Sequence, residues 1–162
     1  MLENCRNATE RWGGVSNIID KWLQDRRNLL VQYCDLVNQG GFDDCEQAVK
    51  EFRNFCQVLL DYVSAGHFEV YEQLFEEAAE FNDSESIALA RQLVPKIQEH
   101  TEAALDFNDK FDKTPEELAE MNAMLKALST LGERLEERFE LEDLLIEKLH
   151  KTHADQLSAS TN

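Results

Sequence analysis

Several polar side chains fall on the apolar faces of the helices that this sequence predicts. Projection at about 100° per residue places Arg26, His67 and Glu142 in the middle of three apolar stripes. Thr101 lies in a fourth stripe, and Asp143 lies at the edge of the one that holds Glu142. A charge buried alone costs several kcal/mol. We therefore expect a buried polar network in which Arg26 pairs with Glu142. His67 is its third member, and Asp143 is the alternative acid.

Three kinds of chemistry are open to such a group. It can be a structural network that fixes the register of the helices, which is the interpretation we favour. It can be an active site, but that chemistry needs a nucleophile beside a base or a glycine-rich phosphate loop, and neither is evident. It can also be a polar pocket that helps to receive a partner or a small ligand. We predict no catalytic residue.

A metal centre is a further possibility for inward-facing acids in a helical bundle. Di-iron bundles need a Glu-x-x-His motif on each of two helices. This chain has one such tetrad, Glu147 to His150, and Glu147 lies well off the core stripe. His100 and His153 are predicted to point elsewhere. We therefore predict no metal site and no cofactor.

The elements that hold these side chains follow from composition and periodicity. The chain has 162 residues, of which 43% are hydrophobic, but only 6 are Gly and 2 are Pro. All-β folds need many more turn residues. Apolar residues recur at helical spacing over four segments, and Pro95 is expected to kink or break the third. These segments cover residues 15–37, 52–78, 87–105 and 118–149.

Short connections between long helices make neighbouring helices antiparallel. We predict an all-α fold, an antiparallel up-down-up-down four-helix bundle with a short N-terminal helical segment. Residues 1–153 would form a single domain, and residues 154–162 a frayed C-terminal tail.

The charge balance limits the possible partners. There are 33 acidic and 16 basic residues, which gives a net charge of −17. Such a surface repels phosphates, so we expect no direct nucleic-acid binding and no membrane binding. It would suit a basic protein. Surplus acids such as Glu76 and Glu77 are expected to face water. Neither a membrane span nor a signal-peptide pattern is evident, and four scattered cysteines indicate free thiols in a reducing cytoplasm.

The segment 52–78 carries an aromatic residue on the face that should meet solvent. Asp61, Ala65, Phe68 and Glu72 lie opposite its core stripe. Either another segment covers Phe68, or this face is a recognition patch with an aromatic anchor ringed by carboxylates. Gly66, inside the same helix, costs about 1 kcal/mol relative to alanine. Close approach of another backbone would explain that glycine.

Three runs of residues carry a family resemblance. They are Phe55-Cys56-Gln57-Val58-Leu59-Leu60-Asp61-Tyr62-Val63-Ser64-Ala65-Gly66-His67-Phe68, Arg138-Phe139-Glu140-Leu141-Glu142-Asp143, and Trp22-Leu23 followed by Arg26 and Leu29-Leu30-Val31. With them, the chain resembles the Rsd/AlgQ family of bacterial regulators of the primary sigma factor. Met1-Leu2-Glu3 and Glu10-Arg11-Trp12-Gly13-Gly14-Val15 are similar to the AlgQ branch, which is associated with alginate regulation.

The resemblance implies a non-enzymatic transcription regulator of the cytoplasm, a monomer or a weak dimer. It would bind region 4 of the primary sigma factor, the basic helix-turn-helix module that reads the −35 promoter element. Binding would compete with promoter DNA and with core RNA polymerase. The implied sigma-binding residues are Asp61, Ser64, Ala65 and Phe68, with Tyr71 and Glu72 as weaker candidates. Two alternatives remain: an acidic helical adaptor for another basic cytoplasmic protein, and a ligand- or metal-binding bundle that uses Arg26, His67 and Glu142.

Overall fold

The computed structural model describes residues 8–38, 45–111 and 118–160, and these residues form an all-α bundle without a β-strand. The all-α prediction is confirmed. The elements are α1 (Ala8–Asn38), α2 (Cys45–Ala65), the π-helical turn η1 (Gly66–Val70), α3 (Tyr71–Glu80), α4 (Ser84–Phe111), α5 (Leu118–Ile146), a second π-helical turn η2 (Glu147–Lys151) and α6 (Thr152–Ser160). No helix among them is long and apolar enough to cross a bilayer.

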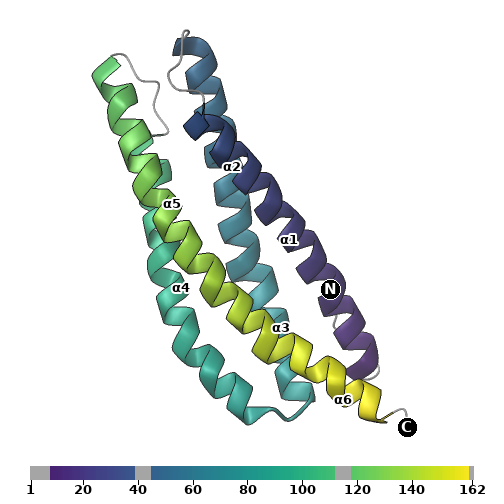
Figure 1. Ribbon diagram of the computed structural model, residues 1–162. Helices are drawn as coiled ribbons and strands as arrows, with labels where there is room; N and C mark the ends of the chain where they lie inside the picture. The colour runs from purple at the N-terminus through teal and green to yellow at the C-terminus, as the bar shows by residue number, and fades with distance from the viewer. Residues whose placement is uncertain (1–7, 39–44, 112–117, 161–162) are drawn as a thin grey trace.

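The long helices lie side by side. Figure 1 shows α1 next to α2, and α5 next to α4, with α3 and α6 near the lower end of the view. The end of α1 and the beginning of α2 lie at the upper end, as do the end of α4 and the beginning of α5. This view is consistent with the predicted up-down-up-down order.

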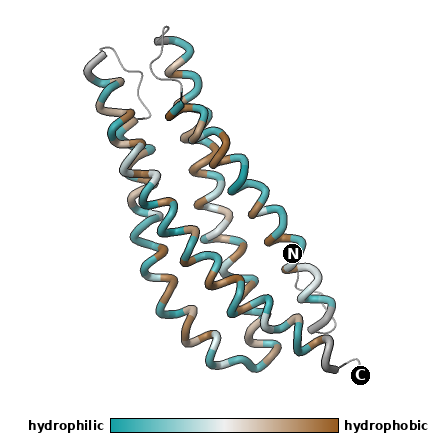
Figure 2. The backbone as a smooth tube through the Cα atoms, in the orientation of Figure 1, coloured by the Kyte–Doolittle hydropathy of each residue, from teal (hydrophilic) through white to brown (hydrophobic). Residues whose placement is uncertain are grey.

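The apolar faces of the helices meet in one core. Figure 2 shows hydrophobic and hydrophilic residues alternating along each helix with the helical period. Among the most deeply buried side chains are Leu29 of α1, Phe55 and Leu59 of α2, Leu128 of α5 and Leu149 of η2. Burying a side chain of this size contributes about 1.5–3 kcal/mol. The core therefore accounts for the stripes seen in the sequence.

The helices differ from the predicted ones at three places. The N-terminal segment is not separate, because α1 is one helix from Ala8. Pro95, which is exposed, does not break α4. Helical structure continues through Ser160, in the segment for which a frayed tail was predicted. His153 in the first turn of α6 is fully buried and lies within hydrogen-bond distance of Glu77, which holds α6 against α3.

The turn between α3 and α4 is stabilised by a capping carboxylate. Asn82 adopts a left-handed conformation with φ 54°, which asparagine tolerates better than most residues. The Asp83 carboxylate accepts a hydrogen bond from the backbone N–H of Ser86 at 3.1 Å. An acidic N-cap satisfies a free amide at the first turn and interacts favourably with the helix dipole. Asp83 therefore fixes where α4 begins.

Candidate functional site

The interior of the bundle holds a carboxylate with four hydrogen-bond donors. The Glu142 side chain is fully buried. Its Oε2 accepts from Arg26 Nη2 at 3.0 Å and from the Tyr62 hydroxyl at 2.5 Å. Its Oε1 accepts from Arg138 Nε at 2.6 Å and from the Tyr71 hydroxyl at 2.9 Å. Because an ionised carboxylate has about four acceptor positions, Glu142 has no free position with which to act as a general base.

Each tyrosine of this network is bridged to Glu142 by an arginine. Arg26 Nε donates to the Tyr62 oxygen at 3.0 Å, and Arg138 Nη2 donates to the Tyr71 oxygen at 3.1 Å. The pKa of both tyrosines is raised well above the ordinary value for tyrosine. Burial is the largest cause, and the nearby charge of Glu142 is the next. Both phenols therefore stay neutral and can donate to the carboxylate.

The two arginines hold their charge although burial opposes it. Desolvation lowers the pKa of Arg26, but its contacts with Tyr62, Asp143 and Glu142 outweigh burial and raise the pKa above its usual value. Arg26 Nη1 also donates to Asp143 at 2.5 Å. The same balance holds for Arg138, where the charge of Glu142 is the largest of the effects that raise the pKa. The network is thus a set of fixed charges and neutral phenols.

The π-helical turn η1 explains how Tyr62 and Tyr71 reach one carboxylate. These residues are separated by about two and a half turns of a regular α-helix, which would place them on opposite faces. A π-helical turn contains more residues than an α-helical one, and η1 lies between them. It therefore changes the register of the chain and brings Tyr71 toward the side of Tyr62.

The same change of register corrects the prediction for His67. A regular helix would direct this side chain into the core, but His67 lies in η1 and is exposed. Its ring packs edge-on against Phe68, with centroids 4.8 Å apart. His67 is therefore not part of the buried network. The other predicted residues lie close to Glu142: Arg26 and Asp143 form the ion pairs described above, and the Thr101 hydroxyl accepts from Arg138 Nη1 at 2.6 Å.

The sequence analysis did not include three members of the network: Tyr62, Arg138 and Tyr71. The family resemblance had implied Tyr71 as a weaker sigma-binding candidate. Tyr71 is buried and cannot contribute to an exposed patch. Arg138 has a recognisable pattern, because it lies one turn before Glu142 on the same stripe of α5 as Leu135. Residues one turn apart on a helix face the same side, so an inward acid at one position indicates an inward base at the other.

Gly66 begins η1 and is buried against aromatic rings. A Cβ at this position would lie 3.0 Å from Trp22 Cζ2 and 3.2 Å from the Tyr71 hydroxyl oxygen. The indole of Trp22 stacks on Tyr62 at a centroid distance of 5.0 Å and donates to the Tyr62 carbonyl at 3.2 Å. The close approach predicted for Gly66 is therefore made by side chains, and not by another backbone.

A second buried polar cluster lies where η2 and α6 meet α3. Glu77 is fully buried, and its oxygens lie 2.6 Å from His150 Nδ1 and 2.9 Å from His153 Nδ1. His153 Nε2 lies 2.9 Å from the Asp83 carboxylate. The predictions that Glu77 faces water and that His153 points elsewhere are both wrong. Two imidazoles supply the partners that a buried acid needs, and Glu77 in turn anchors the C-terminal helix.

This cluster has the geometry of a structural contact. The ring of His150 stacks on Trp12 at 4.5 Å, and the ring of His153 stacks on Phe81 at 4.4 Å. His100, the other histidine considered as a ligand, is also buried and lies 3.5 Å from Glu137. No group of three or more potential ligands among the residues that the structure describes is arranged to hold a metal ion.

The outer face of α2 and η1, unlike the two buried polar clusters, is exposed to solvent. The Phe68 side chain is 74% exposed, so the expectation that it faces solvent is confirmed. Asp61 and Glu72 are also exposed, and Ser64 and Ala65 are half-buried. Asp61 accepts a hydrogen bond from Gln57 at 2.9 Å. This outer face thus carries an exposed apolar side chain together with acids, a combination that can bind the surface of a partner protein.

The fold and these sites together define a class, a helical bundle with a buried network of charged and polar side chains and an exposed aromatic residue on a strongly acidic protein. The chain belongs to the Rsd/AlgQ family, described as regulators of the RNA polymerase sigma(70) subunit, whose family model matches residues 1–150. A protein named Regulator of sigma D from Pectobacterium atrosepticum is 38% identical over 93% of this chain and 99% of its own length.

Other relatives carry the same name. The protein from Pectobacterium carotovorum is 39% identical over 90% of this chain and 96% of its own length. The protein from Yersinia pseudotuberculosis is 34% identical over 91% of this chain and 88% of its own length. The family is one of regulators and not of enzymes, which agrees with a Glu142 that has no free acceptor position.

Proposed function

We propose that this chain binds region 4 of the primary sigma factor through the outer face of α2 and η1, centred on Phe68 and Asp61. The observation that carries the proposal is the 74% exposure of Phe68 on a strongly acidic protein. Exposed aromatic side chains are frequent centres of binding energy, because they can bury a large apolar area in a partner.

Charge supports a partner that normally binds DNA. A helix-turn-helix module presents Lys and Arg side chains to phosphates. In the proposed complex, Asp61 and Glu72 take the place of phosphate oxygens, and Phe68 contributes the buried apolar area. The regulator and promoter DNA then compete for one basic surface. The net charge of −17 also attracts such a surface over a distance and accelerates association.

The proposal places the protein in the cytoplasm with RNA polymerase and assigns no role in binding to the buried network. Glu142 and its partners keep α1, α2 and α5 in register, so that the outer face has a fixed shape. Tyr71 acts only from the inside, through its hydrogen bond to Glu142.

Calorimetric titration tests this function. The chain is titrated into the full-length primary sigma factor and into a sigma variant that lacks region 4, at low and at high salt. The proposal requires binding to the full-length protein only, with weaker affinity and slower association at high salt. Equal affinity for both sigma proteins would assign the contact to another region. No binding to either would favour an adaptor for a different basic protein.

A further inference from the structure

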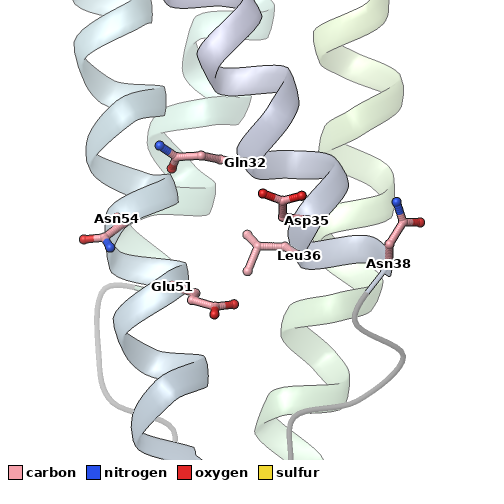
Figure 3. A pocket seen from close by; sticks show the side chains of 6 residues that line it. All are labelled: Gln32, Asp35, Leu36, Asn38, Glu51 and Asn54. Carbon is pink, nitrogen blue, oxygen red and sulfur yellow. The ribbon is translucent and has the colours of Figure 1, made fainter.

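A groove runs between α1 and α2, beginning beside the proposed docking residues. It consists of two adjoining hollows of about 440 and 550 Å³, and Gln32 of α1 lines both. Figure 3 shows the first hollow, where Gln32 and Leu36 from α1 point toward α2, and Glu51 from α2 points toward α1. Asp61, already part of the proposed sigma-binding face, lines the second hollow.

The α2 side of the groove is one helix stripe that reaches the proposed docking patch at Asp61. Glu51, Asn54, Val58 and Asp61 line the hollows, and they follow one another at alternating spacings of about three and four residues, which keeps side chains on one face. Asp61 belongs both to this stripe and to the proposed sigma-binding face, which continues past the end of α2 into η1. The groove therefore meets the proposed sigma-binding face at Asp61.

The groove combines acids with aliphatic side chains. Val31 of α1, which is 55% exposed, and the half-buried Val58 of α2 both line the second hollow. The acids that line the two hollows are Asp25, Asp35, Glu51 and Asp61, whereas Lys21 is the basic side chain among their lining residues. An apolar strip flanked by acids complements an amphipathic helix that carries aliphatic residues on one face and Lys or Arg beside them.

We propose that this groove receives a basic amphipathic helix of the sigma region 4 module, so that the docking surface extends from Phe68 along α1 and α2 to Asp35 and Glu51. This inference rests on the proposed function. An aliphatic side chain of the bound helix covers Val31 and Val58, and its basic side chains lie near Asp35 and Glu51. Helix-in-groove binding of this kind adds apolar area that Phe68 alone does not supply.

A pair of charge reversals tests the groove. Asp35→Lys and Glu51→Lys are combined in one variant, since the two residues lie on facing helices of the first hollow. The matched control combines Glu102→Lys and Asp109→Lys, which are exposed acids of α4 outside both hollows. Both variants change the net charge equally, so they weaken long-range attraction to a similar degree. Circular dichroism verifies that each variant is folded.

Affinity for the full-length primary sigma factor is the measurement. We expect the groove variant to bind at least about tenfold more weakly than the control variant, with most of the difference in the dissociation rate. A neutralising variant, Asp35→Asn with Glu51→Gln, is expected to lose about threefold, which keeps the test valid if the reversals disturb folding.

Two outcomes would overturn the inference, and each can be separated from failure of the proposed function. If the groove and control variants bind alike while Phe68→Ala weakens binding, the contact ends at the Phe68 face and the proposed function stands. If neither the groove variant nor Phe68→Ala changes affinity, the proposed function fails together with the groove.

Discussion

Arg138 and Glu142 lie one turn apart on α5 and form an ion pair whose side chains are both fully buried, with 2.6 Å between Nε and Oε1. Removing charges of this kind from water costs several kcal/mol for each ion, and the cost is offset only when the remaining donors and acceptors are also satisfied. Here Thr101, Tyr71, Tyr62 and Arg26 satisfy them. The pair therefore depends on groups from four helices.

Replacement of Arg138 should destabilise the whole bundle. Arg138→Met fills a similar volume but leaves Glu142 without its closest cation, so we expect a loss of about 3–5 kcal/mol in the free energy of unfolding. Urea denaturation measures the loss. Arg134→Met, one turn earlier on the same helix but exposed, is the control and should change stability by less than about 0.5 kcal/mol. Equal effects of the two substitutions would contradict the account of the network.

Gly66 should not tolerate alanine although it lies within helical structure. The added Cβ would be 3.0 Å from Trp22, whose ring is held by its stacking on Tyr62. We expect Gly66→Ala to lower the free energy of unfolding by about 1–3 kcal/mol, as overpacking does. Gly13→Ala in α1 has no atom within 4 Å of its Cβ and should instead stabilise the protein by about 0.5–1 kcal/mol. Thermal denaturation of both variants checks the difference in sign.

The stabilisation that the Asp83 carboxylate provides should be lost at acid pH. Partial burial alone would raise the pKa of Asp83, but hydrogen bonds with Ser86 and His153 outweigh it and lower the pKa below its ordinary 3.8. A carboxylate whose pKa is lowered by folding stabilises the protein above its unfolded-state pKa, and the stabilisation disappears as the pH falls through the folded-state pKa.

Asp83→Asn keeps the helix cap and removes the charge. The variant should be less stable than the original protein by up to about 1 kcal/mol at pH 6, and the difference should shrink as the pH falls below 3.8 and through the lowered folded-state pKa. Urea denaturation at each pH measures it. A difference that stays constant over this range would mean that the charge of Asp83 is not the stabilising feature.

Periodicity predicted the class of fold because long apolar stripes at helical spacing leave few alternatives. It placed Arg26 and Glu142 on core faces for the same reason. It misplaced His67 because a projection at constant angle cannot detect the π-helical turn η1, whereas Tyr71 was implied as a sigma-binding candidate by the family resemblance and not by periodicity. Local sequence carries little information about such a change of register, since its cause is a contact with a distant helix.

The cluster around Glu77 was missed for a related reason. Glu77 follows another acid, and such pairs usually face water. Its burial depends on His150 and His153, which are distant in sequence and reach it from η2 and α6. By contrast, the exposure of Phe68 was predictable, because it follows directly from the position of this residue opposite the core stripe. Its role in binding stays a prediction.

Truncation of Phe68 tests the central claim most directly. Isothermal titration into the full-length primary sigma factor compares the original chain with Phe68→Ala and with Leu105→Ala, an exposed apolar residue of α4. We predict that Phe68→Ala weakens binding by about 1–3 kcal/mol with unchanged thermal stability, and that Leu105→Ala binds normally. Equal affinities for the three folded proteins would contradict the claim that the Phe68 face is where the sigma factor binds.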